Sequence, residues 1–113
     1  MQEGTKVEKT KAELLSNEFK VAAQIYECNQ NEQKIWFTKL ADLLEPHMSP
    51  ATVMKSLRTL FDWGIVKAEY GPTDKNRAGR LLYIAGESKS TIKEIYENFW
   101  KEKSLLKASC YDK

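Results

Sequence analysis

The sequence has few of the residues on which most enzyme and metal sites depend. Its 113 residues include one histidine, His47, and two cysteines, Cys28 and Cys110, which stand far apart and form no CxxC pair. A single histidine cannot build a His-based metal site, and a catalytic triad would depend on that one residue. The sequence also lacks the GxGxxG, GxxxxGK and HExxH motifs. We therefore expect no enzyme activity, no metal, no cofactor and two free thiols.

Long hydrophobic runs are missing as well. No stretch approaches the roughly 20 apolar residues that cross a bilayer, and the polar start MQEGTKVEKTK is unlike a signal peptide. We expect a cytoplasmic protein without a membrane partner. The length fits one domain, placed at residues 10–107, with flexible segments at 1–9 and 108–113.

The charge is weakly positive overall but unevenly distributed. The formal net charge is +2, divided as −2 over residues 1–48, +3 over residues 49–80 and +1 over residues 81–113. Because binding of phosphate is a local property of one surface, the middle third is the candidate for contact with nucleic acid. Lysine outnumbers arginine 15 to 3 and glutamate outnumbers aspartate 12 to 4, a bias typical of thermophilic or archaeal proteins.

Apolar spacing predicts a helix near each end of the domain. Over residues 11–28, an i, i+4, i+7, i+11 stripe is typical of an amphipathic helix. Ser90 is the predicted N-cap of a last helix that continues to Leu106, within a dimerisation segment at 88–107. Its apolar stripe is larger than a domain of this size usually covers, so we expect a homodimer. The predicted interface consists of Leu15, Phe19, Ile92, Ile95, Tyr96, Phe99 and Trp100.

Three shorter elements are predicted in the middle of the chain. The β-forming residues 35–37 indicate a short strand, and Thr38 is the predicted N-cap of a second helix that ends before Pro46. Ser49 and Pro50 are a strong signal for the start of a third helix, because proline at the first helical position loses no hydrogen bond. This helix has a Val53, Leu57, Leu60, Phe61 stripe and ends at Gly64.

Two alternating segments follow the third helix. Residues 65–70 predict a half-buried strand with Val66, Ala68 and Tyr70 on one side, and residues 80–84 predict a second strand with Leu81 and Tyr83 on one face. The intervening GPTDKNRAG is too short to hold a crossover helix. The strands must therefore form an antiparallel hairpin with a basic loop.

The stretch LADLLEPHMSPATVMKSLRTLFDWGIV resembles the helix-turn-helix of small prokaryotic transcription regulators. Leu40 and Ala41 match the scaffold helix, and residues 49–53 match the start of the recognition helix. Asp74 and Arg77, followed by Gly79-Arg80 and Tyr83, resemble the wing of the multiple-antibiotic-resistance (MarR) and phenolic-acid (PadR) regulators. The resemblance covers about residues 35–85 and implies an α+β, mainly helical, winged helix-turn-helix fold. The choice between the two families stays open.

The outer face of the third helix is the candidate reader of double-stranded DNA. At 100° per residue, its short polar and basic side chains fall opposite the apolar stripe or on its flanks, a pattern suited to the major groove. An ordinary solvated face and an ordinary charged loop tip are the alternatives, and Arg80 could be structural. The predicted DNA-binding residues are Ser49, Ala51, Thr52, Lys55, Ser56, Arg58, Thr59, Lys75, Arg77 and Arg80.

The remaining conspicuous residues give weaker indications. Trp36, Trp63 and Trp100 each stand beside an apolar pattern, so packing is favoured over an aromatic ligand pocket. His47 is interpreted as a turn residue, exposed or near the DNA backbone. The sequence therefore predicts a homodimeric transcription regulator that binds double-stranded DNA, with a winged-helix protein interaction module as the alternative. It does not indicate whether a small-molecule effector binds.

Overall fold

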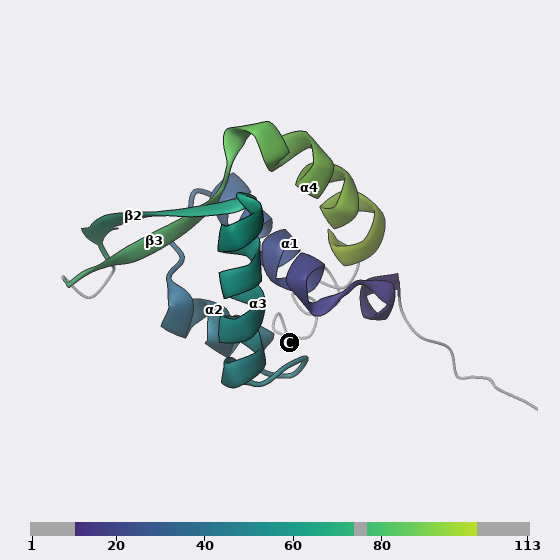
Figure 1. Cartoon of the computed structure of the whole chain (residues 1–113), viewed down its shortest axis with the longest axis horizontal. Coiled ribbons are helices and arrows are strands. Elements are labelled where there is room, and N and C mark those ends of the chain that lie inside the picture. The colour runs from purple at the N-terminus through teal and green to yellow at the C-terminus, as the bar shows by residue number, and fades with distance from the viewer. Residues whose placement is uncertain (1–10, 74–76, 102–113) are drawn as a thin grey trace, which may run out of the picture.

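The computed structural model describes residues 11–73 and 77–101. In these parts of the chain, four α-helices surround one apolar core, and a two-stranded hairpin projects from it (Figure 1). The elements in chain order are a 3-10 turn (Lys11–Leu14), α1 (Asn17–Gln30), α2 (Phe37–Leu44), α3 (Pro50–Trp63), β2 (Val66–Pro72), β3 (Ala78–Ile84), a 3-10 turn (Gly86–Ser88), α4 (Lys89–Ile95) and a π turn (Tyr96–Trp100).

The predicted first helix is divided by a cap at Ser16. The Ser16 hydroxyl accepts a hydrogen bond from the Phe19 amide at 3.3 Å, so α1 begins at Asn17 and the preceding turn is separate. Such a cap satisfies one of the amide groups that the first turn of a helix leaves unpaired. From there the predicted stripe is confirmed, because Ala22 and Tyr26 are buried in the core.

The predicted strand at residues 35–37 does not form. Phe37 already belongs to α2, and the N-cap is Trp36, which makes no side-chain cap bond. Thr38 therefore lies inside the helix, and its prediction as N-cap was wrong. What remains of the strand is one hydrogen bond, from the Leu82 amide to the Ile35 carbonyl at 2.8 Å. Ile35 is buried, and its segment runs along the free edge of β3.

The third helix has the predicted ends. The Ser49 hydroxyl accepts a hydrogen bond from the Thr52 amide at 3.2 Å, and Pro50 occupies the first turn. At the other end Gly64 has a φ of 77°, a left-handed conformation that strains a residue with a Cβ atom. The chain then enters the hairpin directly, so the cap at Gly64 fixes where the hairpin leaves the helix.

The two strands pair antiparallel as predicted, with Val66 opposite Ile84 and Pro72 opposite Ala78. Each strand extends farther toward the loop than expected. Tyr70 is 78% exposed and Ala68 is half-buried, so the predicted half-buried face ends near Ala68. The loop end of the hairpin projects away from the helices (Figure 1). On β3 the buried residues are Leu82 and Ile84, while Leu81 and Tyr83 share the opposite, half-buried face.

The side chain of Asn29 attaches the base of the hairpin to the end of α1. Its amide nitrogen donates to the Leu82 carbonyl at 3.3 Å, and its amide oxygen accepts from the Ile84 amide at 3.0 Å. Together with the Ile35 carbonyl, it satisfies backbone groups on the edge of β3 that would otherwise lack a partner strand. The sequence placed the end of this helix at residue 28 and contained no signal for this role of Asn29.

The C-terminal helix packs against α1 in the same chain. Ser90 is not its N-cap, because α4 begins at Lys89, directly after the turn Gly86–Ser88. Ile92 is 0% exposed and Trp100 is 2% exposed, so both belong to the core of one chain and are not surface residues. Their assignment to a dimer interface is corrected accordingly. The predicted end at Leu106 lies outside the described residues.

A buried polar contact fixes the position of Trp100. Its indole Nε1 donates to the Gln24 side-chain oxygen at 3.2 Å, and the Gln24 amide lies 3.8 Å from the Cys28 sulfur. The π turn at Tyr96–Trp100 carries the indole to this partner. Cys28 is a free, buried thiol whose pKa is raised by desolvation, so it should react poorly in the native fold. Cys110 lies outside the described residues.

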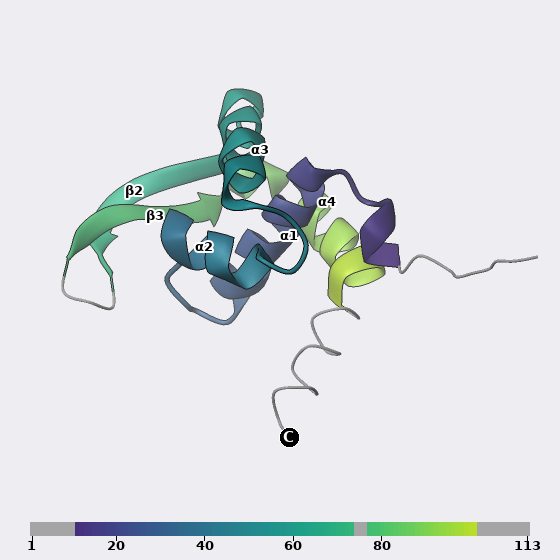
Figure 2. The same ribbon diagram turned by 90° about the horizontal axis from the view of Figure 1, so that it is seen from below.

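The order of helix, helix, turn, helix, hairpin and helix is that of a winged helix-turn-helix domain, as predicted. Viewed from below, α2 and α3 lie beside the hairpin, which curves past them as the wing (Figure 2). Within residues 11–73 and 77–101, no helix has the length and apolar character to cross a membrane.

Candidate nucleic-acid interface

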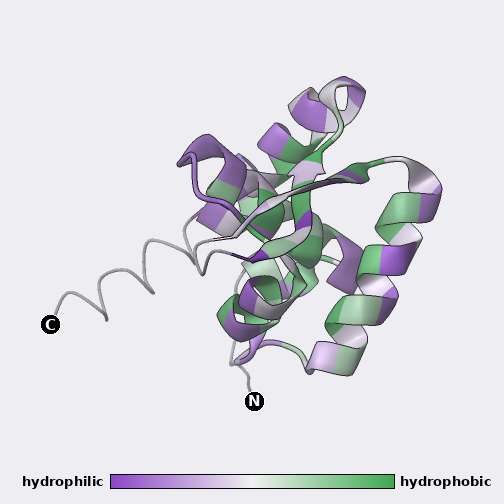
Figure 3. Ribbon diagram, turned by 90° about the vertical axis from the view of Figure 1, so that its left-hand side faces the viewer, coloured by the Kyte–Doolittle hydropathy of each residue, from purple (hydrophilic) through white to green (hydrophobic). Residues whose placement is uncertain are grey.

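The outer face of α3 is open along the length of the helix. The helix stands at one edge of the molecule, with hydrophilic and hydrophobic residues on different sides (Figure 3). Ala51, Lys55 and Arg58 are exposed, and Thr52 and Thr59 are half-buried. These residues therefore share one accessible surface, which combines short side chains near the start of the helix with two cations in its middle.

The hydroxyl groups on this surface are held by the helix itself. The Ser49 and Thr52 hydroxyls lie 3.1 Å apart, and Ser49 also serves as the N-cap. The Thr59 hydroxyl donates to the Lys55 carbonyl at 3.3 Å. A hydroxyl oxygen has two acceptor lone pairs, so the Thr59 hydroxyl keeps both and the Thr52 hydroxyl keeps at least one to accept a hydrogen bond from a base amino group. Their orientations are thereby restricted before any ligand binds.

Ser56 does not belong to this surface. It is 2% exposed and lies between the buried residues Val53 and Leu60. At 100° per residue, Ser56 falls only about 40° from Leu60 around the helix axis. Its prediction as a DNA-binding residue was therefore wrong, because a flank so close to the apolar stripe is covered by the core.

Two further residues share the outer face of α3. Met54 is 37% exposed, and Asp62 is exposed one turn after Arg58. The same helical projection places Asp62 near Ala51 and Lys55, so the sequence contained the signal. A carboxylate here repels phosphate. The surface that suits DNA is therefore the first two thirds of α3.

The wing contributes two described arginines. Arg77 is exposed, and its backbone carbonyl accepts from the Thr73 amide at 2.7 Å and from the Thr73 hydroxyl at 3.1 Å, which closes the hairpin below its loop. Arg80 is exposed on β3, and its guanidinium carbon lies 5.2 Å from the centre of the Phe61 ring. Lys75, the third predicted cation, lies outside the described residues.

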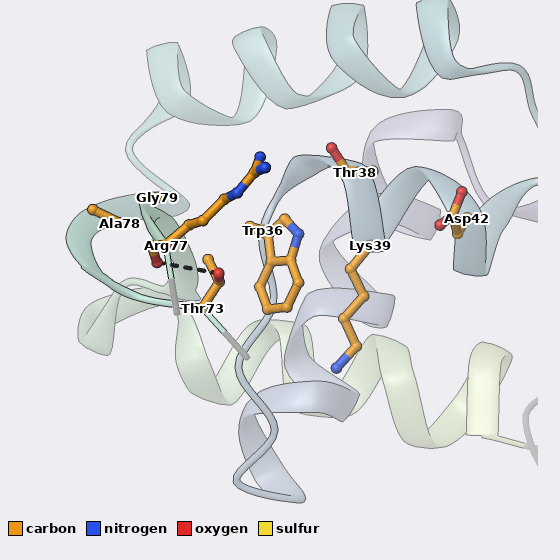
Figure 4. A pocket seen from close by; sticks show the side chains of 8 residues that line it. All are labelled: Trp36, Thr38, Lys39, Asp42, Thr73, Arg77, Ala78 and Gly79. Atoms are coloured by element: carbon orange, nitrogen blue, oxygen red, sulfur yellow. Dashed lines mark hydrogen bonds between the residues drawn. The ribbon is translucent and has the colours of Figure 1, made fainter. Parts of the chain in front are cut away.

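A cleft of about 550 Å³ separates the start of α2 from the wing (Figure 4). Trp36 stands within it, with Arg77 on the wing side and Lys39 on the helix side. The Lys39 ammonium lies 5.3 Å from the Trp36 ring centre and donates to the Lys34 carbonyl at 3.2 Å. One cation thus lies on each side of this cleft, and sequence reasoning missed Lys39.

The three tryptophans have different environments. Trp100 is a core residue, as the packing prediction required, whereas Trp36 is half-buried beside the cleft and Trp63 is 55% exposed. His47 is half-buried, with its ring 5.7 Å from that of Trp100 in an edge-on arrangement. It packs the turn before α3 against the C-terminal helix. Among the described residues, no three His, Cys, Asp or Glu side chains gather as a metal site requires.

Comparison with known proteins identifies relatives at the level of fold. No protein-family model matches the chain, and no curated protein sequence is significantly similar to it. The solved structure of the circadian clock associated protein Pex from Anabaena is similar, with a TM-score of 0.61 and 15% identity over 83% of this chain and 84% of that one. Pex from Synechococcus gives a TM-score of 0.52 and 18% identity over 75% and 82% of the two chains.

A third similar structure is a mutant of ZitR from Lactococcus lactis. It has a TM-score of 0.56 and 22% identity over 91% of this chain and 64% of that chain. Similarity at such low identity establishes the fold alone. Any function must therefore be inferred from the surface formed by α3 and the wing.

Proposed function

We propose that this protein is a transcription regulator that binds double-stranded DNA sequence-specifically as a homodimer. In this proposal, α3 enters the major groove and the wing contacts the backbone or the minor groove. The observation that carries it is the accessible face of α3, with Lys55 and Arg58, beside a wing that presents Arg77 and Arg80. An α-helix fits the major groove, and arginine and lysine are the usual partners of guanine and phosphate.

The wing sequence supports a relationship to the MarR and PadR regulators. Gly79, Arg80 and Tyr83 belong to β3, and Arg77 is two residues before Gly79. A Cβ atom on Gly79 would approach the Thr73 methyl group to 3.0 Å, so a larger residue there requires that side chain to shift slightly. The family assignment is thus a proposal that depends on the wing and on the start of α3.

Apolar residues on the surface favour a second copy of the chain. Leu14 is 67% exposed, and Trp63 lies with its ring 6.3 Å from that of Phe19. The half-buried residues Leu15, Ile95 and Tyr96 pack at the edge of the core and retain part of their surface, and Phe99 is half-buried as well. In a twofold dimer, the two recognition helices would reach successive major grooves about 34 Å apart.

Removing the two cations of the wing loop should weaken binding to all DNA sequences alike. For Lys75→Ala combined with Arg77→Ala, the slope of log affinity against log salt should become shallower by about 3 to 4, because four phosphate contacts per dimer each contribute about 0.9. The measurement is a salt titration on a selected operator and on random duplex DNA. An unchanged slope would contradict contact between the wing and the duplex.

A further inference from the structure

A second hollow adjoins the cleft between α2 and the wing, and it lies between β3, α3 and the start of α2. Both hollows are lined by Trp36, Thr38 and Gly79. It has a volume of about 490 Å³, and Met54, Leu57 and Leu82 form part of its apolar lining. Two cations border it, Arg58 from α3 and Arg80 from β3. We refer to it as the helix–wing groove. It lies within the surface assigned to DNA and combines an apolar lining with positive charge from two separate elements.

Phe61 determines where the Arg80 guanidinium lies. The guanidinium carbon is 5.2 Å from the centre of the Phe61 ring, a distance at which the ring face attracts a cation. Arg80 is paired across the hairpin with Tyr70, in the part of the wing that extends beyond the core. A long side chain at such a position would otherwise sample many rotamers in solvent. The contact with Phe61 instead directs it to the helix–wing groove.

We propose that the helix–wing groove binds one sugar–phosphate unit of the DNA backbone, with Arg58 and Arg80 on the phosphate and Phe61 as the positioning residue for Arg80. This proposal rests on the proposed function. The planar guanidinium forms two parallel hydrogen bonds with phosphate oxygens, and the apolar lining suits the carbon face of a deoxyribose. The groove therefore sets the register of α3 on the duplex, since phosphate contacts fix orientation.

The test compares the single variants Phe61→Leu, Phe61→Tyr and Arg80→Gln with the double variant Phe61→Leu and Arg80→Gln. Binding is measured by fluorescence anisotropy on a random duplex of about 30 base pairs, which is long enough for two half-sites. Arg80→Gln should weaken binding about tenfold and make the salt slope shallower by about 0.9 for each phosphate that the protein no longer neutralises. Phe61→Leu, which changes no charge, should weaken binding by roughly three- to tenfold. Phe61→Tyr keeps the ring and should bind like the parent.

The diagnostic result is the affinity of the combined variant. If Phe61 acts only through Arg80, then Phe61→Leu with Arg80→Gln binds no more weakly than Arg80→Gln alone. The proposal is overturned if the losses of binding free energy of the two single variants add fully in the double variant, or if Phe61→Leu binds like the parent. Either result leaves DNA binding itself intact. Lys93→Gln, an exposed site on α4, is the matched charge control, and thermal unfolding of each variant identifies loss of fold. Failure of the parent protein to bind any duplex at low salt overturns the proposed function itself, and this proposal with it.

Discussion

Replacing Trp100 with alanine is expected to lower the free energy of unfolding by about 3 to 5 kcal/mol, the usual cost of truncating a buried tryptophan. Trp100 is 2% exposed, and its Nε1 donates to Gln24. The substitution would remove the indole and leave the Gln24 oxygen without this donor. Because domains of this size have only about 5 to 15 kcal/mol of stability, this loss is a large share of the total and should clearly lower the midpoint of unfolding.

Chemical denaturation followed by circular dichroism measures this effect. Tyr70→Ala, another aromatic truncation, is the control, since Tyr70 is 78% exposed and its replacement should cost about 1 kcal/mol or less. A similar decrease in both variants, or a small decrease at Trp100, would contradict the assignment of Trp100 to the core. A decrease that depends on protein concentration would instead place Trp100 between two chains.

The second large effect is expected at the exposed face of α3. Thr52→Ala and Lys55→Ala should each weaken binding to a selected operator by about 1 to 3 kcal/mol for each base that the variant can no longer bind, or roughly five- to 150-fold. Binding to random DNA should change much less with Thr52→Ala, because a hydroxyl carries no charge. Thermal unfolding should stay close to that of the parent, since Lys55 is exposed and Thr52 is half-buried.

Ser56→Ala is the control for this experiment. Ser56 is on the same helix but buried, so its replacement should alter stability and leave operator affinity unchanged. Competition binding on operator and random duplexes measures the affinities, and thermal unfolding measures the stability. If Thr52→Ala and Lys55→Ala both bind the operator like the parent, this face of α3 does not read DNA, and the protein interaction alternative gains support.

The elements that the sequence predicted best are those with local chemical signals. The Ser49-Pro50 start and the Gly64 end of α3 depend on cap and backbone preferences that adjacent residues determine. The antiparallel hairpin followed from loop length alone. By contrast, the strand at 35–37 was predicted from β-propensity, which depends on context, and a single hydrogen bond to Leu82 is all that the fold provides there.

The errors at the site have tertiary causes. Ile92 is buried within one chain, which the periodicity of its own segment cannot show. The contact of Arg80 with Phe61 joins residues from different elements, and the same is true of Trp100 with Gln24. Local periodicity predicted which apolar residues share one face of a helix. It could not determine whether the partner of an apolar stripe is the same chain or a second one.

Sequence-specific binding of DNA is tested most simply by selecting bound fragments from a pool of random duplex DNA with the full-length protein. We predict enrichment of one sequence with twofold symmetry, whose half-sites are about one helical turn apart, because a dimer would place two copies of α3 in successive major grooves. The same selection with Lys55→Ala should lose enrichment at the base position that Lys55 contacts and keep it elsewhere. Recovery of fragments with no shared sequence, or no retention of duplex at low salt, would contradict sequence-specific binding of DNA by this protein.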